Sequence, residues 1–390
     1  MSIALSRTVA EEALGLSLPH RRMEEWRWTD LRQMIDKPYP PRQQVTAAAG
    51  EVERLLSASI FHGVAATRMV FVNGHYDAAH SKLANDAVEI MAEADEPVLQ
   101  MNAAFATDGA RIRLSGNIDR PVELVFIATN AAPRTIATRN VIEVADDASA
   151  TIIETHLGEG SYLSNSVTEI RVGANARLDR VKAEIESHEA THLAHSHVTL
   201  ARNVTFRDFT LSTGARLNRQ NGTYRFDGEF TDAKVSGAYL LAGKQHADTR
   251  LVVDHRVPNC ASRELFQCVM DDHARGIFQG KVIVRQHAQK TDGKQSSHAL
   301  LLSETAEFDA KPELEIYADD VACGHGATAG DLNHDHIFYL KSRGIPEAEA
   351  KALLIAAFVG EAFDMIHHDG LREALTDYAA RWLTEHRRAG

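Results

Sequence analysis

Apolar and polar residues alternate along the middle of the chain, from about residue 111 to about residue 316. Short apolar segments there are separated by Gly, Asn and Asp, and no window of three or four turns has a helical stripe. Alternation with a period of two is typical of β-strands, whereas a helix repeats its apolar positions every three to four residues. We therefore expect a β-rich core in this region.

The same region repeats itself weakly at an offset of 28 residues. The segments that begin at Ile142, Ile170 and Val198 align, and each reads as a strand, a turn of small residues and a second strand. Periods of roughly 20 to 50 residues indicate solenoids, so we predict a β-helix in which these three residues point into one interior stack. A β-sandwich with coincidental spacing is the alternative that this pattern leaves open.

Helical patterns flank this core on both sides. Before it, residues 21–34 and 89–106 have helical composition, whereas Met69–Asn73 forms a short apolar strand that ends at the turn residue Gly74. After it, the pattern predicts helices over 332–343 and 346–366, separated by Gly344 and Pro346. A third helix follows, with one apolar face made of Leu371, Leu375, Tyr378 and Trp382. We therefore divide the chain into a mainly helical domain (1–110), a β-helix core (111–316) and a helical domain (317–390).

The second of the C-terminal helices contains the longest apolar run of the chain, LLIAAFV, from Leu353 to Val359. A helix that is apolar on every side is either buried or covered by a partner. We therefore take Leu353, Leu354, Phe358 and Val359 as candidate partner-binding residues.

Composition describes an ordinary globular chain. Hydrophobic residues make up 44% and charged residues 25%, which excludes global disorder. The net charge of −12 argues against binding to nucleic acid or to an anionic membrane through the overall field. The three cysteines, Cys260, Cys268 and Cys323, form no disulfide framework. Since the N-terminus lacks a signal-peptide pattern and no apolar run is long enough to span a membrane, we expect a soluble, cytoplasmic protein.

Common catalytic and nucleotide-binding motifs are absent from the sequence. It contains no GxxxxGK[ST], GxGxxG, GxSxG, HExxH or CxxC pattern. This argues against phosphate loops, hydrolase elbows and the simplest zinc sites.

Cys323 and His325 form the sharpest candidate for chemistry. In an extended backbone these two residues project to the same side, where a thiolate and an imidazole provide half of a soft-metal site. Two ligands are too few for a closed site, so the others would come from elsewhere in the chain or from a partner. The alternative is a buried cysteine beside a hydrogen-bonded histidine.

Four histidines lie close together at positions 188, 192, 195 and 197. Four imidazoles could bind a transition metal. Their mixed spacing suits neither one helix face nor one strand face, so we interpret them as solvated loop histidines.

The C-terminal third resembles the SufB/SufD family of iron–sulfur cluster assembly scaffolds. The resemblance rests on ARGIFQGKVIVRQHAQKTDGKQSSHALLLSETAEFDAKPELEIYADDVACGHGATAGDL, on FYLKSRGIPEAEAKALLIAAF and on the N-terminal EEWRWTDL. The CGHGAT stretch is similar to the CSHGAT-type motif of the SufD branch, with Gly324 where Ser is common. The ETKNWYP-like block and the additional cysteines of the SufB branch are not found.

The resemblance implies a mainly β protein, with a right-handed parallel β-helix core flanked by N- and C-terminal α-helical domains. It also implies a complex with a SufB-like paralogue and a SufC-like ABC ATPase, without enzymatic turnover by this chain alone. By the motif, His325 and Cys323 are candidate ligands of a transient iron–sulfur cluster shared with SufB, and no tightly bound cofactor is expected. The C-terminal helices would dock SufC.

Two alternatives stay open. One is a secreted-type β-helix enzyme that acts on polysaccharides, against which the missing signal peptide and the absence of a prominent carboxylate pair argue. The other is a sibling scaffold that forms a homodimer without SufB.

Overall fold

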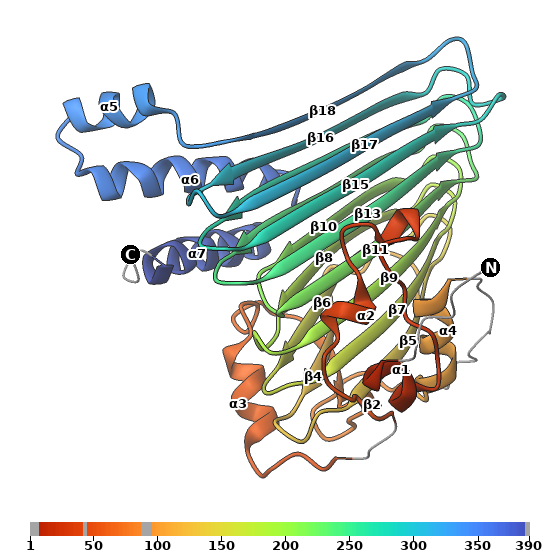
Figure 1. Ribbon diagram of the computed structural model, residues 1–390. Coiled ribbons are helices and arrows are strands. Elements are labelled where there is room, and N and C mark those ends of the chain that lie inside the picture. Colours follow the sequence, from red (N-terminus) through yellow and green to blue (C-terminus); the bar gives the residue numbers. More distant parts are fainter. Residues whose placement is uncertain (1–7, 42–44, 87–95, 387–390) are drawn as a thin grey trace, which may run out of the picture.

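The core of the molecule is a parallel β-solenoid built from two sheets (Figure 1). The computed structural model describes residues 8–41, 45–86 and 96–386. The ten-stranded sheet contains, in spatial order, β18 (Ala322–Gly330), β16 (Asp292–Leu301), β14 (Ala261–Met270), β12 (Asp232–Leu241), β10 (Thr205–Ser212), β8 (Arg177–Ile185), β6 (Ser149–Gly158), β4 (Val122–Ala128), β1 (Thr67–Val72) and β2 (His75–Tyr76). The eight-stranded sheet contains β17 (Glu307–Ile316), β15 (Arg275–Val284), β13 (His246–His255), β11 (Leu217–Phe226), β9 (Thr191–Leu200), β7 (Leu163–Val172), β5 (Thr135–Val144) and β3 (Arg111–Leu114).

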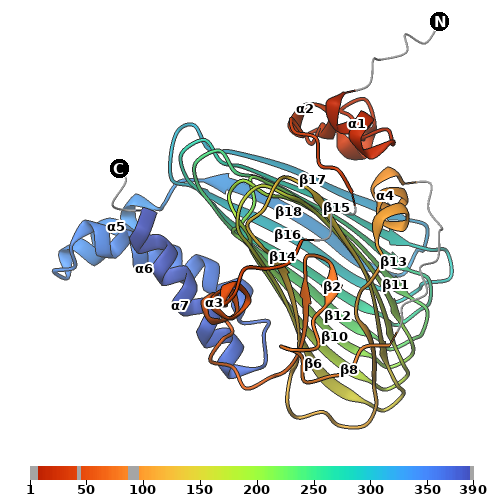
Figure 2. The same ribbon diagram turned by 90° about the horizontal axis from the view of Figure 1, so that it is seen from below.

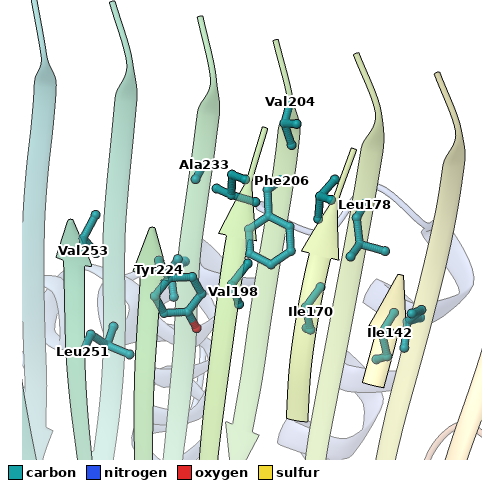
Figure 3. Close-up of a cluster of buried hydrophobic side chains, with 14 of the residues drawn as sticks. Ile142, Ile170, Leu178, Val198, Val204, Phe206, Tyr224, Ala233, Leu251 and Val253 are labelled. Carbon is teal, nitrogen blue, oxygen red and sulfur yellow. The ribbon is translucent and has the colours of Figure 1, made fainter. Parts of the chain in front are cut away.

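Each coil contributes one strand to each sheet, and the coils stack in parallel register. Ile142 on β5 pairs with Ile170 on β7, which pairs with Val198 on β9. All three are buried in one interior cluster between the sheets, as Figure 3 shows. The predicted interior stack is therefore confirmed. Because the sheets are joined coil by coil into parallel ladders, the β-sandwich alternative is wrong.

The repeating turn between coils is built from aspartate and asparagine. Asp147, Asn175 and Asn203 stand 28 residues apart and have φ angles of 58°, 59° and 57°. The amide of Asn175 donates to Asp147, and that of Asn203 donates to Asn175, each over 3.0 Å. These residue types tolerate left-handed backbone best after glycine, which explains the turn of small polar residues in each repeat.

The N-terminal region is less helical than its composition predicts. Residues 21–34 form only a short 3₁₀ turn, η1 (Glu24–Trp26), and one helical turn, α2 (Leu31–Met34), so the continuous helix expected there is wrong. The strand expected at residues 69–73 is confirmed as β1. Pro97–Phe105 forms the predicted helix, α4, while residues 89–95 lie outside the described residues. The other helices of this region are α1 (Val9–Leu14) and α3 (Glu51–Ala58).

Three helices follow the last strand, as predicted: α5 (His334–Ser342), α6 (Glu347–Phe363) and α7 (Asp369–His386). The C-terminal part of α6 and helix α7 cover the outer face of the ten-stranded sheet, while α1, α2 and α4 lie against the other sheet (Figure 2). Leu371 and Leu375 are completely buried, as the apolar face of α7 predicts. In the described part of the chain, no helix is both long and apolar enough to cross a bilayer.

The predicted domain boundaries cut through a continuous sheet. Strand β1 lies in the region assigned to the N-terminal domain and β18 in the region assigned to the C-terminal domain, yet both belong to the ten-stranded sheet. The division at residues 110 and 316 therefore stays a prediction about the sequence pattern.

Candidate functional site

Cys323 and His325 lie on β18, the outermost strand of the ten-stranded sheet. Strand β18 pairs with β16 on one side only, with Cys323 opposite Gly293 and His325 opposite Gln295. Gly293 and Gln295 are buried, whereas Lys294 between them is exposed, so this register directs Cys323 and His325 toward the interior of the solenoid. The two predicted ligands therefore share one strand face at the end of the solenoid.

The two side chains differ in exposure. The Cys323 side chain is half-buried and packs against the interior apolar cluster, while His325 is exposed. Burial raises the pKa of the Cys323 thiol above its usual value, so the sulfur carries its proton at neutral pH until a metal displaces it. The arrangement therefore offers one accessible imidazole and one thiol at the rim of the last coil.

Glycines beside these residues leave space that the chain itself does not fill. A Cβ atom built at Gly324 or at Gly326 would meet nothing within 4 Å. The packing of this chain therefore does not require a glycine at either position. The space next to the unpaired edge of β18 is open to another molecule.

Two buried polar residues that the sequence analysis missed continue the ladder below His325. Gln295 pairs with His325 on one side and with Glu264 on the other. The Gln295 amide is buried without a hydrogen-bond partner among the described residues. Burial raises the pKa of Glu264 to about 8, so this carboxyl is mostly protonated at neutral pH. In the sequence each is an ordinary polar residue of a strand, and nothing there distinguishes it from a solvent-facing one.

The described residues contain no group of three or more His, Cys, Asp and Glu side chains that could hold a metal ion. The other two cysteines, Cys260 and Cys268, are buried. Burial also raises the pKa of the Cys268 thiol strongly. Cys323 and His325 therefore supply at most half of a coordination site within this chain.

The predicted partner-binding residues of α6 fall into two groups. Leu353 is 48% exposed, Leu354 and Phe358 are half-buried, and Val359 is completely buried against the sheet. Helix α5 and the first turns of α6 project beyond the solenoid (Figure 1). Phe338 on α5 is 73% exposed, and a pocket of about 720 Å³ lies between α5, α6 and α7. The apolar surface available to a partner is thus wider than α6, but it does not include Val359.

The interpretation of the histidine cluster as solvated loop residues is wrong for three of its four members. His192, His195 and His197 lie on β9, and only His188 lies in the preceding exposed turn. His195 and His197 stack at 4.1 Å between ring centroids on the outer face. His192 points the other way and is completely buried. Both faces of this strand are covered, which the mixed spacing of the histidines conceals.

His192 belongs to a buried charged network inside the solenoid. Its ring contacts Glu184 at 3.1 Å and Glu186 at 2.6 Å, and Lys182 lies 2.7 Å from Glu184. Burial lowers the pKa of His192, but the charges of Glu186 and Glu184 outweigh it and raise this pKa to about 9. The imidazole is therefore a cation at neutral pH. It is committed to two carboxylates and has no lone pair available for a metal.

Arg180 connects a second part of this network. It contacts Glu154 at 2.7 Å and Asp208 at 3.1 Å, and all three side chains are buried. Tyr224 donates a hydrogen bond to Asp208 over 2.9 Å. Burial raises the pKa of Glu154, but the charges of Arg180 and Lys182 outweigh it and hold this pKa well below its usual range. The network is a set of satisfied ion pairs.

Comparisons with known proteins agree with this architecture. Residues 126–358 match the family model described as the SufBD core domain of the SUF system for FeS cluster assembly. The chain is 30% identical over 381 residues to the iron–sulfur cluster assembly protein SufD of Escherichia coli, which covers 93% of this chain and 89% of that protein. It is 32% identical over 399 residues to an iron–sulfur cluster assembly SufBD family protein of Synechocystis, which covers 92% and 86%. The SufD protein of Bacillus subtilis is 26% identical over 317 residues, covering 79% and 71%.

Proposed function

This chain belongs to the SufB/SufD family of SUF-system iron–sulfur cluster assembly proteins, and we propose that it is a SufD-like scaffold subunit that supplies half of a cluster-building site. The observation that carries the proposal is the position of His325 and Cys323 on one face of the unpaired strand at the open end of the solenoid. The nascent cluster is the cargo of this site.

The open end of the solenoid supports pairing with a SufB-like paralogue. On the last coil, Ile316 and Tyr317 are exposed, and β18 is exposed along most of its length. Stacked β-coils need a cap at each end because a terminal coil leaves its strand edges and interior side chains uncovered. A second solenoid placed against β17 and β18 would cover these groups and bring its own ligands to Cys323 and His325.

The two ligand types suit a cluster that must later be released. Thiolate sulfur and neutral imidazole both bind iron, and imidazole ligation occurs in a class of iron–sulfur centres with altered potentials. In this proposal His325 is the essential ligand, while a thiolate of the paralogue can replace Cys323. The isolated chain has no catalytic turnover of its own.

The projecting helices support docking of a SufC-like ABC ATPase. The exposed side chains Phe338 on α5 and Leu353 on α6 flank the pocket at the C-terminal helices. Val359 and its neighbours hold α6 against the sheet, so they act by positioning this surface. ATP hydrolysis would then take place on the partner, consistent with the missing phosphate loop.

The first experiment replaces His325 in the complex co-expressed with its SufB-like and SufC-like partners. We expect His325→Ala to leave the complex assembled and to abolish cluster formation, measured by anaerobic optical spectra and iron content. The matched control is His298→Ala, since His298 lies on the adjacent strand, faces outward and contacts Thr328 at 2.7 Å. Full cluster yield from an assembled His325→Ala complex would remove His325 from the mechanism.

The second experiment tests ATPase docking by point substitution. Removing residues from 345 onward would uncover the apolar outer face of the ten-stranded sheet, so truncation is unsuitable. The double variant Phe338→Asp, Leu353→Asp is expected to lose the ATPase in co-purification, whereas Phe230→Asp, an exposed aromatic in the turn before β12, should retain it. Unchanged ATPase binding by the double variant would place docking elsewhere.

The two alternative functions give different results. A homodimeric scaffold would form a stable complex without the SufB-like chain, which light scattering of the purified chain would detect. A polysaccharide-acting β-helix would depolymerise a uronic-acid polymer in isolation.

A further inference from the structure

The outer face of the eight-stranded sheet is covered over only half of each strand. The N-terminal segment packs on the first half, where Leu163, Leu193 and Leu217 are completely buried beneath it. Toward the ends of the same strands the outward-facing residues become exposed, as at Arg171 on β7 and Arg225 on β11. This bare half of the sheet lies away from the candidate cluster half-site, which is on the last strand of the other sheet.

Three arginines form a straight row across this bare surface. Arg113 pairs in register with Glu143, Glu143 with Arg171, Arg171 with Thr199, and Thr199 with Arg225. The arginines therefore stand on every second strand, on the same face and at the same level. Since neighbouring strands are about 4.8 Å apart, the spacing between successive arginines is about 10 Å.

The row lies in a continuous groove with an excess of positive charge. Two adjoining hollows of about 470 and 670 Å³ share Glu143, Arg171, Thr199 and Arg225 in their walls. Six arginines and three carboxylates line them, in a chain whose net charge is −12. The lining arginines are Arg111, Arg113, Arg139, Arg171, Arg202 and Arg225. A local excess of cations on an acidic protein produces a field that attracts anions to this face.

The intervening carboxylates orient the arginines and leave them accessible. Arg171 donates to Glu143 at 3.1 Å and to Glu169 at 3.3 Å, yet its side chain is 59% exposed. Arg225 donates to Asp227 at 2.9 Å. Arg113 is exposed and has no ion pair within the described residues. A guanidinium group has five N–H donors, so those not used by these carboxylates can bind a further anion.

We propose that this groove binds an extended acidic segment of another protein, which crosses the strands and presents a carboxylate at about every third residue. Three residues of extended chain span about 10 Å, which matches the arginine row. A single small anion cannot contact arginines spaced so far apart. A nucleic-acid backbone carries closely spaced phosphates that Glu143, Glu169 and Asp227 would repel, so the alternating pattern favours a protein segment with separated charges.

The test uses the full-length chain and two synthetic peptides of identical composition. One peptide of about twelve residues has Asp at every third position, with Ser and Gly between, and the other has its Asp residues in one block. Binding is measured by fluorescence anisotropy at low ionic strength, and repeated with a short DNA duplex and with pyrophosphate. We expect the periodic peptide to bind more tightly than the blocked one, and its affinity to fall as salt is added.

Charge reversal distinguishes this groove from general electrostatic attraction. Replacing one cation of the row by an anion exchanges attraction for repulsion, so Arg171→Glu should weaken the periodic peptide by about tenfold. Lys244→Glu carries the same change in net charge on an exposed turn at the opposite ends of these strands, and should change binding by less than about twofold.

Three results would overturn the proposal. These are equal affinity for both peptides, equal effects of Arg171→Glu and Lys244→Glu, and no measurable peptide binding. Tighter binding of the duplex would identify a nucleic-acid surface instead, and tighter binding of pyrophosphate would identify a small-anion site. Neither experiment involves His325, so the outcome is independent of the proposed cluster site.

Discussion

The middle coils and the last coil of the solenoid place ionisable side chains on the same interior face, with opposite results. In the middle, Arg180 and His192 meet carboxylates from neighbouring strands, and every one of these groups is buried. On the last coil, Cys323 and His325 have a neighbouring strand on one side only. Identical strand geometry therefore produces a structural ion network where coils lie on both sides, and an open ligand pair where one side is missing.

The difference follows from desolvation. A charge inside the solenoid loses its water and is stable only when opposite charges and hydrogen bonds replace that water. A side chain at the rim keeps contact with solvent and needs no partner in this chain. A metal cluster requires ligands that are not already engaged, so only the rim is suited to hold one. Four predictions test this contrast, beginning with the largest effect.

Arg180→Met should be the most damaging single change. It leaves Glu154 and Asp208 buried without their shared cation, and breaking such a buried pair costs about 3–5 kcal/mol of unfolding free energy. The control is Arg171→Met, an exposed arginine for which we expect a change below about 1 kcal/mol. Urea denaturation measures both, and similar losses would contradict the contrast.

Glu264→Gln should stabilise the protein at pH 7.5. The folded-state pKa of Glu264 is about 8, well above that of an unfolded glutamate, so stability contributed by this group is present at low pH and declines as pH rises from about 4.5 to 8. Glutamine removes this dependence, with a gain on the order of 3 kcal/mol at pH 7.5. The exposed Glu304→Gln is the control, and a loss of stability in Glu264→Gln would show that the carboxylate is favoured there.

His192 should make folding stability depend on pH in the neutral to alkaline range. Its folded-state pKa is raised to about 9, so the stability that it contributes is fully present below about pH 6.5 and is lost as pH rises through 9. Thermal unfolding at several pH values should therefore give a decline that is absent in His192→Gln. An unchanged decline in the variant would assign it to other groups.

His325→Ala should have the smallest effect on stability. The imidazole is exposed and no hydrogen bond of this side chain is seen within the described residues, so we expect less than about 0.5 kcal/mol in urea denaturation of the isolated chain. A substantial loss, rescued by His325→Gln, would instead support the alternative of a histidine that hydrogen-bonds within a turn.

The N-terminal segment illustrates why composition alone misled. Trp26 is buried because Arg219 stacks on it at 4.5 Å, and Arg219 in turn pairs with Asp248 on the next strand. Thr29 also donates to Asp248. The segment is therefore shaped by contacts with strands almost 200 residues away, which hold it in short turns. A local helical preference is a weak term beside such contacts.

The candidate site was predictable only in part. The Cys323–His325 spacing and the surrounding motif identified the ligand pair, because side-chain parity along a strand is a local property. Glu264 and Gln295 escaped notice because they join His325 only through the register between coils. His192 was misassigned for a related reason, since sequence patterns assume one buried face and β9 has two.

The sequence by itself determined the solenoid: the 28-residue offset, the alternation of apolar residues and the Asp and Asn turns are all local, and each coil repeats them. The tertiary structure decided which interior positions became buried ion pairs, which arginines aligned in a row, and which ligands stayed free. Those outcomes depend on how many strands surround a residue and on register between strands about 30 residues apart. Neither is encoded within the span of a single repeat.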